Sequence, residues 1–249
     1  MIRPLVGTSW KMNLTPSRAA VYCAALRSLV ADVDDRTLFV LPPFPSLPCA
    51  RDLLAGSNVA WGAQDVHPDV EGAHTGDVSA SMLADLGCTF VEVGHHERRR
   101  DHHEDDDLIA SKVAAIHHWG MTAILCVGEE HRTTPEAARA HVLGQLRFVE
   151  DFDPARLVVA YEPAWAIGVG AERAPSEWIG AMHEAIHERL AEAAGGRAAI
   201  AVIYGGSVDA AGAREILASP GVDGLFVGRY ALTAEGFAEI AHTPLRPER

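Results

Sequence analysis

The apolar run Thr-Ala-Ile-Leu-Cys-Val at residues 122–127 is followed by Thr134-Pro135-Glu136, by a helical pattern at 137–149, and by a second apolar run, Leu-Val-Val-Ala, at 157–160. Each run has the length of a strand and is apolar throughout, which is typical of a strand covered on both faces. Proline and an acidic residue in the first turn are helix start signals. The stretch therefore predicts a strand, a helix and a second, parallel strand.

This unit repeats along the whole chain. Strand-length apolar runs lie at residues 5–6, 37–41, 59–63, 89–93, 122–127, 157–160, 199–203 and 224–227. Further helix starts, Pro16-Ser17 and Pro175-Ser176-Glu177, precede helical patterns at 19–29 and 178–194. The repeat is roughly 31 residues long, which is about one strand and its crossover helix. Eight such units close into a (β/α)8 barrel, so we predict an α/β fold with a single barrel domain over residues 1–249.

A doubly wound open sheet is the structural alternative. That fold usually carries a glycine-rich dinucleotide turn after its first strand. Here the corresponding segment, Gly7-Thr8-Ser9-Trp10-Lys11, lacks the G-x-G-x-x-G spacing. The sequence also contains no linker, low-complexity tract or compositional shift that would divide it into two domains. We therefore prefer the barrel.

The composition argues against several classes of partner. The formal net charge is −13, and the longest basic run is Arg98-Arg99-Arg100, so we expect neither nucleic-acid nor membrane binding. No uninterrupted apolar segment reaches the length of a membrane-spanning helix, and the first residues lack the apolar core of a signal peptide. The cysteines, Cys23, Cys49, Cys88 and Cys126, are far apart and form no metal or disulfide pattern. We expect a soluble, cytoplasmic protein with reduced thiols.

Three polar residues follow predicted strands. Lys11 follows the first strand, His95 the fourth and Glu162 the sixth. In a (β/α)8 barrel the loops after the strands meet at one end and build the active site. Taken alone, each residue is more often a surface or structural side chain than a catalytic one. Together, a cation, an imidazole and a carboxylate at one barrel mouth favour proton transfer beside a carbonyl group.

Glycines cluster towards the end of the chain, in Ile167-Gly168-Val169-Gly170, Tyr204-Gly205-Gly206-Ser207 and Val227-Gly228-Arg229. Loops after the seventh and eighth strands of such barrels commonly bind phosphate through backbone N–H groups. Glycine allows the close backbone approach that this binding needs, although simple tight turns also use glycine. The clusters therefore predict a phosphate site.

Four ordered motifs now carry a resemblance to the triosephosphate isomerase family: W-K-M-N at 10–13, G-H-H-E-R-R at 94–99, Y-E-P-A-W-A-I-G at 161–168 and Y-G-G-S-V at 204–208. Shorter blocks, A-Q-D-V at 63–66, G-A-H-T-G-D at 72–77 and C-V-G-E at 126–129, keep the family order. The resemblance covers nearly the whole chain. It implies a TIM barrel, a small phosphorylated sugar as substrate, and neither a cofactor nor a metal.

The resemblance also implies residue roles. Glu162 would be the base that moves a proton between adjacent carbons, and His95 the neutral electrophile that polarises the carbonyl, as in triosephosphate isomerases generally. Lys11 would pair with the substrate phosphate and the developing oxyanion, and Glu97 would belong to the same catalytic group. Residues 163–170 would form a lid that excludes water, as loop closure does in this family. Gly168, Ser207 and Gly228 would contact the phosphate.

A homodimer is the last implication of the resemblance. The loop from His74 to Asp77 would reach towards Lys11 of a second copy. Gly72, Ala73 and Gly76 leave this loop poorly able to hold its shape as a free arm.

Several positions depart from the family pattern. Ser9 replaces an asparagine beside Lys11, His96 replaces the serine of G-H-S-E-R-R, and Arg229 replaces a glycine at the phosphate loop. Asp65 and Asp77 replace an asparagine and a glutamate. We expect Ser9 to open space at the reacting end of the substrate site and Arg229 to add a permanent charge near the phosphate.

Two of these departures, in G-T-S-W-K-M-N and D-G-L-F-V-G-R, resemble a branch of the superfamily described as L-erythrulose 1-phosphate isomerase. A four-carbon ketose phosphate carries a hydroxymethyl group where the three-carbon substrate carries a hydrogen. The same glutamate, histidine and lysine would then convert L-erythrulose 1-phosphate into D-erythrulose 4-phosphate. Both substrates remain open at this point.

Two other classes of function compete with an isomerase. His95 and His96, together with the acidic and histidine-rich residues 101–107, could form a metal site. Residues Asp105 to Asp107, however, suit the positive end of the following helix. A barrel that binds a phosphorylated ligand without turning it over is the other alternative. The retained Lys11, His95 and Glu162 argue against it, because a pure binding protein needs no base.

Overall fold

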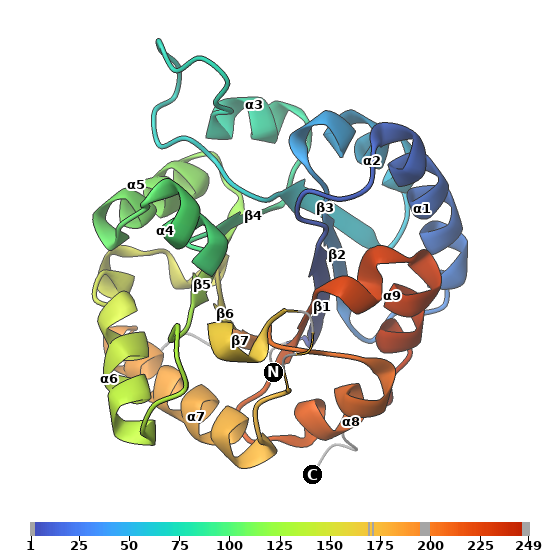
Figure 1. Ribbon diagram of the computed structural model, residues 1–249. Helices are drawn as coiled ribbons and strands as arrows, with labels where there is room; N and C mark the ends of the chain where they lie inside the picture. Colours follow the sequence, from blue (N-terminus) through green and yellow to red (C-terminus); the bar gives the residue numbers. More distant parts are fainter. Residues whose placement is uncertain (1–2, 169, 171, 195–199, 246–249) are drawn as a thin grey trace.

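Eight parallel strands close into a barrel in the computed structural model, which describes residues 3–168, 170, 172–194 and 200–245 (Figure 1). Each strand pairs with the next along the chain, and the last pairs with the first. The strands are β1 (Leu5–Ser9), β2 (Thr37–Leu41), β3 (Val59–Ala63), β4 (Phe90–Val93), β5 (Thr122–Val127), β6 (Leu157–Tyr161), β7 (Ala201–Tyr204) and β8 (Gly224–Val227). The predicted (β/α)8 barrel is confirmed.

Helices form a ring around the barrel (Figure 1). Within the described residues they are α1 (Pro16–Leu29), α2 (Leu47–Leu54), α3 (Ala80–Asp85), α4 (His96–His102), α5 (Asp106–His118), α6 (Pro135–Gln145), α7 (Ser176–Ala193), α8 (Ala210–Ala218) and α9 (Ala234–Ala241). Short 3-10 helices add η1 (Phe44–Ser46), η2 (Val149–Asp151), η3 (Pro154–Arg156), η4 (Ala164–Ala166) and η5 (Arg229–Leu232). The helix starts at Pro16, Pro135 and Ser176 agree with the sequence signals.

Several element boundaries differ from the prediction by one to four residues, most of all at β1 and α6. Strand β1 runs on to Ser9 because its last residues continue the register with β2, where Ser9 is opposite Leu41. Helix α6 stops at Gln145, and the chain passes through η2 before β6, whereas the pattern predicted helix to residue 149. Gly144 in the last turn lowers helix propensity there. Ala199, which begins the seventh predicted strand, lies outside the described residues.

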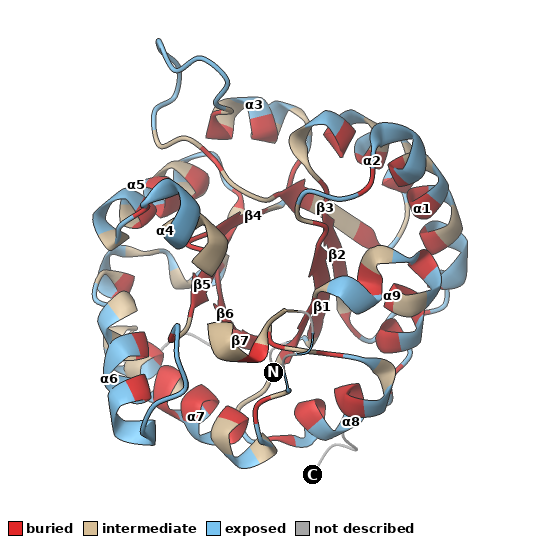
Figure 2. Ribbon diagram, viewed as in Figure 1, coloured by how far each residue is buried: buried red, intermediate tan, exposed pale blue. Residues whose placement is uncertain are grey.

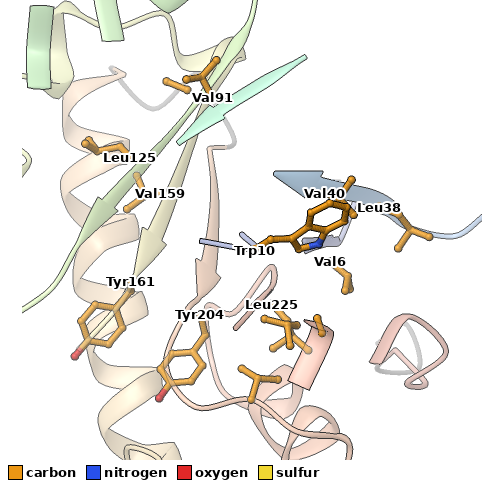
Figure 3. Close-up of a cluster of buried hydrophobic side chains, with 14 of the residues drawn as sticks. Val6, Trp10, Leu38, Val40, Val91, Leu125, Val159, Tyr161, Tyr204 and Leu225 are labelled. Carbon is orange, nitrogen blue, oxygen red and sulfur yellow. The ribbon is translucent and has the colours of Figure 1, made fainter. Parts of the chain in front are cut away.

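The core has two layers, because alternate strand residues face opposite sides of the barrel wall. Side chains inside the barrel include Leu5, Phe39, Ile124, Val158, Ile203 and Phe226. A larger layer lies between the strands and the helices, and Figure 3 shows part of it, including Val6, Val40, Val91 and Leu225. The strands are buried on both faces while the outer helix surfaces are exposed (Figure 2). This explains the continuously apolar runs.

Two further sequence expectations concern cysteines and membranes. All four cysteines are free, and Cys23, Cys88 and Cys126 are buried. Among the described residues, every helix is too short or too polar to cross a bilayer.

Candidate active site

A cavity of about 870 Å³ opens among the loops that follow the strands. It brings together every residue that the sequence proposed for the site: Ser9, Lys11, His95, Glu97, Glu162, Gly168, Ser207, Gly228 and Arg229. These residues are far apart in the chain and meet because the carboxyl ends of parallel strands share one end of the barrel.

Glu162 follows β6 and is 4% exposed. Its backbone N–H donates to the Val127 carbonyl at 2.8 Å, which fixes the start of the loop against β5. The side chain packs over Gly205, where a Cβ atom would lie 2.6 Å from Glu162 Cγ. Burial raises the carboxyl pKa, but His95, His96 and Lys11 together hold the pKa below its ordinary value. Glu162 is therefore a carboxylate at neutral pH and can accept a proton.

His95 faces this carboxylate, with Nε2 3.3 Å from Glu162 Oε2. The residue caps α4, and its Nδ1 accepts a hydrogen bond of 3.1 Å from the Glu97 backbone N–H. A nitrogen that accepts carries no proton, so the neutral imidazole carries its proton on Nε2. Burial lowers the His95 pKa to about 4, against the charge of Glu162. His95 is thus a neutral imidazole whose Nε2 lies beside the base, while Glu162 Oε2 accepts no hydrogen bond within the described residues.

Lys11 lies two residues after the end of β1 with a φ of 52°, an unusual conformation for a residue other than glycine. Its carbonyl accepts from the Gln64 amide at 3.1 Å, and Gln64 also donates to Leu41 at 2.8 Å. Lys11 Nζ lies 2.9 Å from Glu97 Oε1. The structure therefore places Glu97 as the ion-pair partner that holds Lys11 at the cavity.

Two of the predicted phosphate residues, Ser207 and Arg229, contact the loop after β6, which is the predicted lid. The Ser207 hydroxyl and backbone N–H both donate to the Ala166 carbonyl, at 2.9 and 3.1 Å. The Arg229 guanidinium donates to the Gly168 carbonyl. Gly168 has a φ of 120°, which favours glycine. Val169, within the predicted lid, lies outside the described residues.

Glu129 anchors the lid from below, a role that the sequence did not predict although its motif was recognised. Its carboxylate accepts from Trp165 Nε1 at 2.8 Å and from the Tyr161 hydroxyl at 3.1 Å. Arg132 covers the Trp165 ring at 5.2 Å. These contacts tie the residues that follow Glu162 to Glu129, which lies two residues after β5, and to Tyr161 at the end of β6.

Glu92 is a cavity residue that the sequence interpretation missed. It is 2% exposed and lies on β4, inside a run that was read as uniformly apolar. The Ser9 hydroxyl donates to Glu92 Oε2 at 2.7 Å, and the Cys126 thiol is 3.7 Å from Oε1. Burial and the nearby Glu162 charge raise the Glu92 pKa to about 8. The available signal was the acid in Phe-Val-Glu-Val, directly before Gly-His-His-Glu.

Acids of the block after α4, which the metal alternative invoked together with His95 and His96, form ion pairs and a helix cap in the structure, whereas His95, His96 and Glu97 lie close enough together to offer ligand atoms within 4.8 Å of one another. Glu104 accepts from Arg98 and Lys112, at 2.7 and 2.6 Å. Asp105 caps α5 by accepting from the Leu108 N–H at 2.9 Å. Asp106 pairs with Arg99 at 2.6 Å. These acids already have cationic or backbone partners, as the helix-start interpretation expected.

The comparisons with known proteins agree with this geometry. A family model described as triosephosphate isomerase matches residues 4–243. The chain belongs to the triosephosphate isomerase family. It is 46% identical to a triosephosphate isomerase of Thermus thermophilus, over 96% of this chain and 98% of that protein. It is 43% identical to one from a Roseiflexus species, over 97% and 98% respectively.

A crystal structure of triosephosphate isomerase from Bartonella henselae matches the fold with a TM-score of 0.85 and 30% identity, covering 97% of this chain and 99% of that one. In triosephosphate isomerases a glutamate base acts beside a neutral histidine at a helix N-terminus, under a closing loop. Glu162, His95 and the segment after Glu162 have the matching arrangement here.

Arg229 is expected to affect the phosphate end of the site. The side chain is exposed but crosses from η5 to the lid rather than pointing away. A guanidinium in this position can add charge-assisted hydrogen bonds to a substrate phosphate. We expect Arg229→Gly to raise KM and to weaken the salt dependence of kcat/KM. Arg214→Gly, at an exposed position on α8, is the control for loss of one positive charge. Unchanged KM and salt dependence in Arg229→Gly would exclude the phosphate role.

Proposed function

We propose that this chain, an isomerase of the triosephosphate isomerase family, interconverts dihydroxyacetone phosphate and glyceraldehyde 3-phosphate and serves glycolysis and gluconeogenesis. The observation that carries this proposal is the Glu162 carboxylate facing the neutral His95 Nε2 at 3.3 Å, in the cavity that also holds Lys11. A base, a neutral donor and a cation are the groups that an enediolate mechanism needs.

The reaction follows from these groups. Glu162 takes a proton from the carbon next to the carbonyl, and the C–H electron pair forms a carbon–carbon double bond. The carbonyl π electrons move to oxygen, where the His95 N–H and the Lys11 ammonium stabilise the developing charge. The proton of the neighbouring hydroxyl must then reach the charged oxygen, and we assign this transfer to His95 Nε2, which gives its proton to one oxygen and takes the proton of the other. Glu162 returns its proton to the former carbonyl carbon, and the carbonyl re-forms one position along. No atom is gained or lost.

The phosphate end prevents a side reaction. An enediolate phosphate can expel its phosphate, so exclusion of water and control of the phosphate pose favour isomerisation. We assign this task to the lid and to Gly168, Ser207, Gly228 and Arg229, with Lys11 as a further cation. The contacts of Ser207 and Arg229 with lid carbonyls support this assignment, because substrate binding and lid position would then depend on the same side chains.

A second candidate substrate is L-erythrulose 1-phosphate, which the same chemistry would convert into D-erythrulose 4-phosphate. Such an activity would serve erythritol catabolism. The observation that favours this candidate is Ser9, a short side chain at the reacting end of the cavity. Its hydroxyl is held by Glu92 rather than free.

The deciding experiment is a side-by-side assay of dihydroxyacetone phosphate and L-erythrulose 1-phosphate in D2O. Isomerase function predicts turnover of at least one substrate, with solvent deuterium incorporated at the reacting carbon. Phosphate binding without exchange into either compound would instead support a non-catalytic barrel.

We also propose that the chain acts in the cytoplasm as a homodimer. Met12, next to Lys11, is 98% exposed, which is unusual for a large apolar side chain. Beside it lies a cavity of about 290 Å³, whose lining includes Phe44 and Gln64. The loop containing His74 to Asp77 projects from the ring of helices (Figure 1). An exposed methionine, a cavity and a projecting loop support this proposal, because a symmetric interface needs a protruding part on one copy that fits a recess on the other.

Contacts within the projecting loop give it more structure than its glycines indicated. His74 lies 2.9 Å from Asp69 and stacks on His67, with ring centroids 3.9 Å apart. The Asp77 N–H donates to the His74 carbonyl at 3.1 Å. The loop therefore has a defined conformation with which it could bind a partner.

Sedimentation at micromolar concentration is expected to give a dimer, and Met12→Glu is expected to shift it to monomer with lower activity, because a charge cannot be buried there without a partner. Met82→Glu is a control, since Met82 is also exposed, at 54%, but lies on α3. A fully active monomer of the parent protein would contradict the proposal.

A further inference from the structure

Glu92 stands on the inward face of β4, two positions after Phe90, which packs against the barrel interior. Its carboxyl group lines the cavity next to His95 and Glu162. One ligand atom from each of Glu92, His95 and Glu162 lies within 4.8 Å of the others. Glu92 is therefore close enough to meet the same small substrate.

The protonation of Glu92 follows from its surroundings. The titratable groups that face it are Lys11 after β1, His95 after β4, Cys126 on β5 and Glu162 after β6. Two carboxylates at this distance cannot both be ionised at low cost. Because Glu162 is nearer the imidazoles, it keeps the charge, and burial with the Glu162 charge leaves Glu92 as the neutral acid, with a pKa of about 8.

Glu92 and Ser9 together have more hydrogen-bonding groups than their own contact uses. Neutral Glu92 brings one O–H and Ser9 brings another, but their contact at 2.7 Å uses only one of them. The other O–H group can donate only to the weak sulfur acceptor of Cys126, which lies 3.7 Å from Glu92 Oε1, or to a group inside the cavity. Both residues line the cavity. The pair thus presents a hydrogen-bond donor and free lone pairs to whatever lies beside the base.

The position of the pair in the barrel defines which part of the substrate it can meet. The proposed phosphate contacts, Gly168, Ser207 and Gly228, follow β6, β7 and β8. Ser9 and Glu92 lie on β1 and β4, on the same strands that lead to Lys11 and His95, and their side chains meet at 2.7 Å. They line the same cavity as the phosphate residues but lie next to the reacting groups, so they can meet the end of the substrate that is not phosphorylated. The two oxygens of a three-carbon enediolate already have donors in Lys11 and His95.

We propose that Glu92 and Ser9 form a subsite for a hydroxyl group on one additional carbon at the reacting end, so that Glu92 is a specificity-determining residue for a four-carbon ketose phosphate. This inference rests on the proposed isomerase function and deepens it. Glu92 accepts from or donates to the hydroxyl of the hydroxymethyl group, while Ser9 leaves the room that this group occupies.

A buried acid also costs stability, and this gives a second measurement. In the unfolded chain Glu92 ionises near its ordinary pKa, whereas in the fold it stays protonated up to a pKa of about 8. Between these values the folded state binds more protons than the unfolded state, so the Glu92 contribution to stability falls as pH rises. Glu92→Leu removes this dependence. The Tm gain of Glu92→Leu over the parent should therefore be larger at pH 8 than at pH 5.

The kinetic test compares parent, Glu92→Leu and Glu92→Gln on dihydroxyacetone phosphate and L-erythrulose 1-phosphate at pH 7. Loss of a hydrogen-bonding group that meets a substrate hydroxyl is expected to lower kcat/KM about 10- to 100-fold. We expect the loss in Glu92→Leu to be at least about tenfold larger with the four-carbon substrate than with the three-carbon substrate. Glu92→Gln keeps a donor and an acceptor and should retain most of the four-carbon activity.

Three outcomes would overturn the inference. A parallel loss with both substrates would assign Glu92 to the reacting oxygens or to the fold, and no loss with either would leave it without a role in the site. A parent enzyme that converts only the three-carbon substrate would also refute it, while leaving the proposed isomerase function intact. Failure of the isomerase function itself is separate, because the parent would then exchange deuterium into neither compound.

Discussion

Glu162→Asp is expected to lower kcat by about 100-fold, because it draws the carboxylate back by one methylene, and a displacement of about 1 Å from the reacting carbon can cost this much. The shorter side chain would also lose its packing over Gly205 and its approach to His95 Nε2. KM should change little, since the phosphate contacts are untouched. The measurement is steady-state kinetics with both candidate substrates.

Glu136→Asp is the matched control for this change. Glu136 is exposed in the first turn of α6, where aspartate is also favourable. Its kinetics should equal those of the parent. If Glu162→Asp stays within twofold of the parent, Glu162 is not the base. Glu162→Gln adds a second test, since it keeps the volume but cannot take a proton and should lose deuterium exchange as well.

Ser9→Asn is expected to shift the ratio of kcat/KM values towards dihydroxyacetone phosphate by about 10- to 200-fold, corresponding to 1 to 3 kcal/mol. The longer side chain fills the space beside the reacting carbon that a hydroxymethyl group would occupy. It also replaces the hydroxyl that donates to Glu92 Oε2 at 2.7 Å. The measurement is competition between the two substrates in one reaction mixture.

The surface substitution Ser111→Asn on α5 gives the control, because Ser111 is exposed and its hydroxyl donates to the Asp107 carbonyl of the same helix. It should leave the ratio unchanged. A ratio that stays constant in Ser9→Asn, or that moves towards the four-carbon substrate, would mean that Ser9 does not set substrate size.

The barrel, and the residues that lie at the carboxyl ends of its strands, could be predicted from the sequence. Periodic apolar runs define the order of strands, and the order of strands brings Lys11, His95 and Glu162 to one end. What those residues do to one another could not be predicted. The 3.3 Å approach of Glu162 to His95, and the N–H that fixes the His95 tautomer, depend on side-chain rotamers and loop geometry.

Glu92 shows a different limit. A strand buried on both faces is recognised by its apolar average, and one acid among Phe90, Val91 and Val93 does not change that average. The role of Glu92 depends on its position on the inner face of β4 and on its hydrogen bond with Ser9, which lies 83 positions away in the sequence. Arg229 was predicted at the phosphate end but not as a contact of the Gly168 carbonyl, because nothing local in the sequence relates these two loops.

The close packing of Glu162 on Gly205 has a consequence for genetic variation. A methyl group at position 205 would lie 2.6 Å from Cγ and 2.7 Å from Oε1 of the base, closer than atoms tolerate. Even alanine, the smallest replacement, would push the carboxylate out of line. If every amino acid were tried at position 205 and active variants selected, we expect glycine alone to be recovered. Position 205 would then look as invariant as the catalytic residues, although glycine contributes no side chain to the reaction.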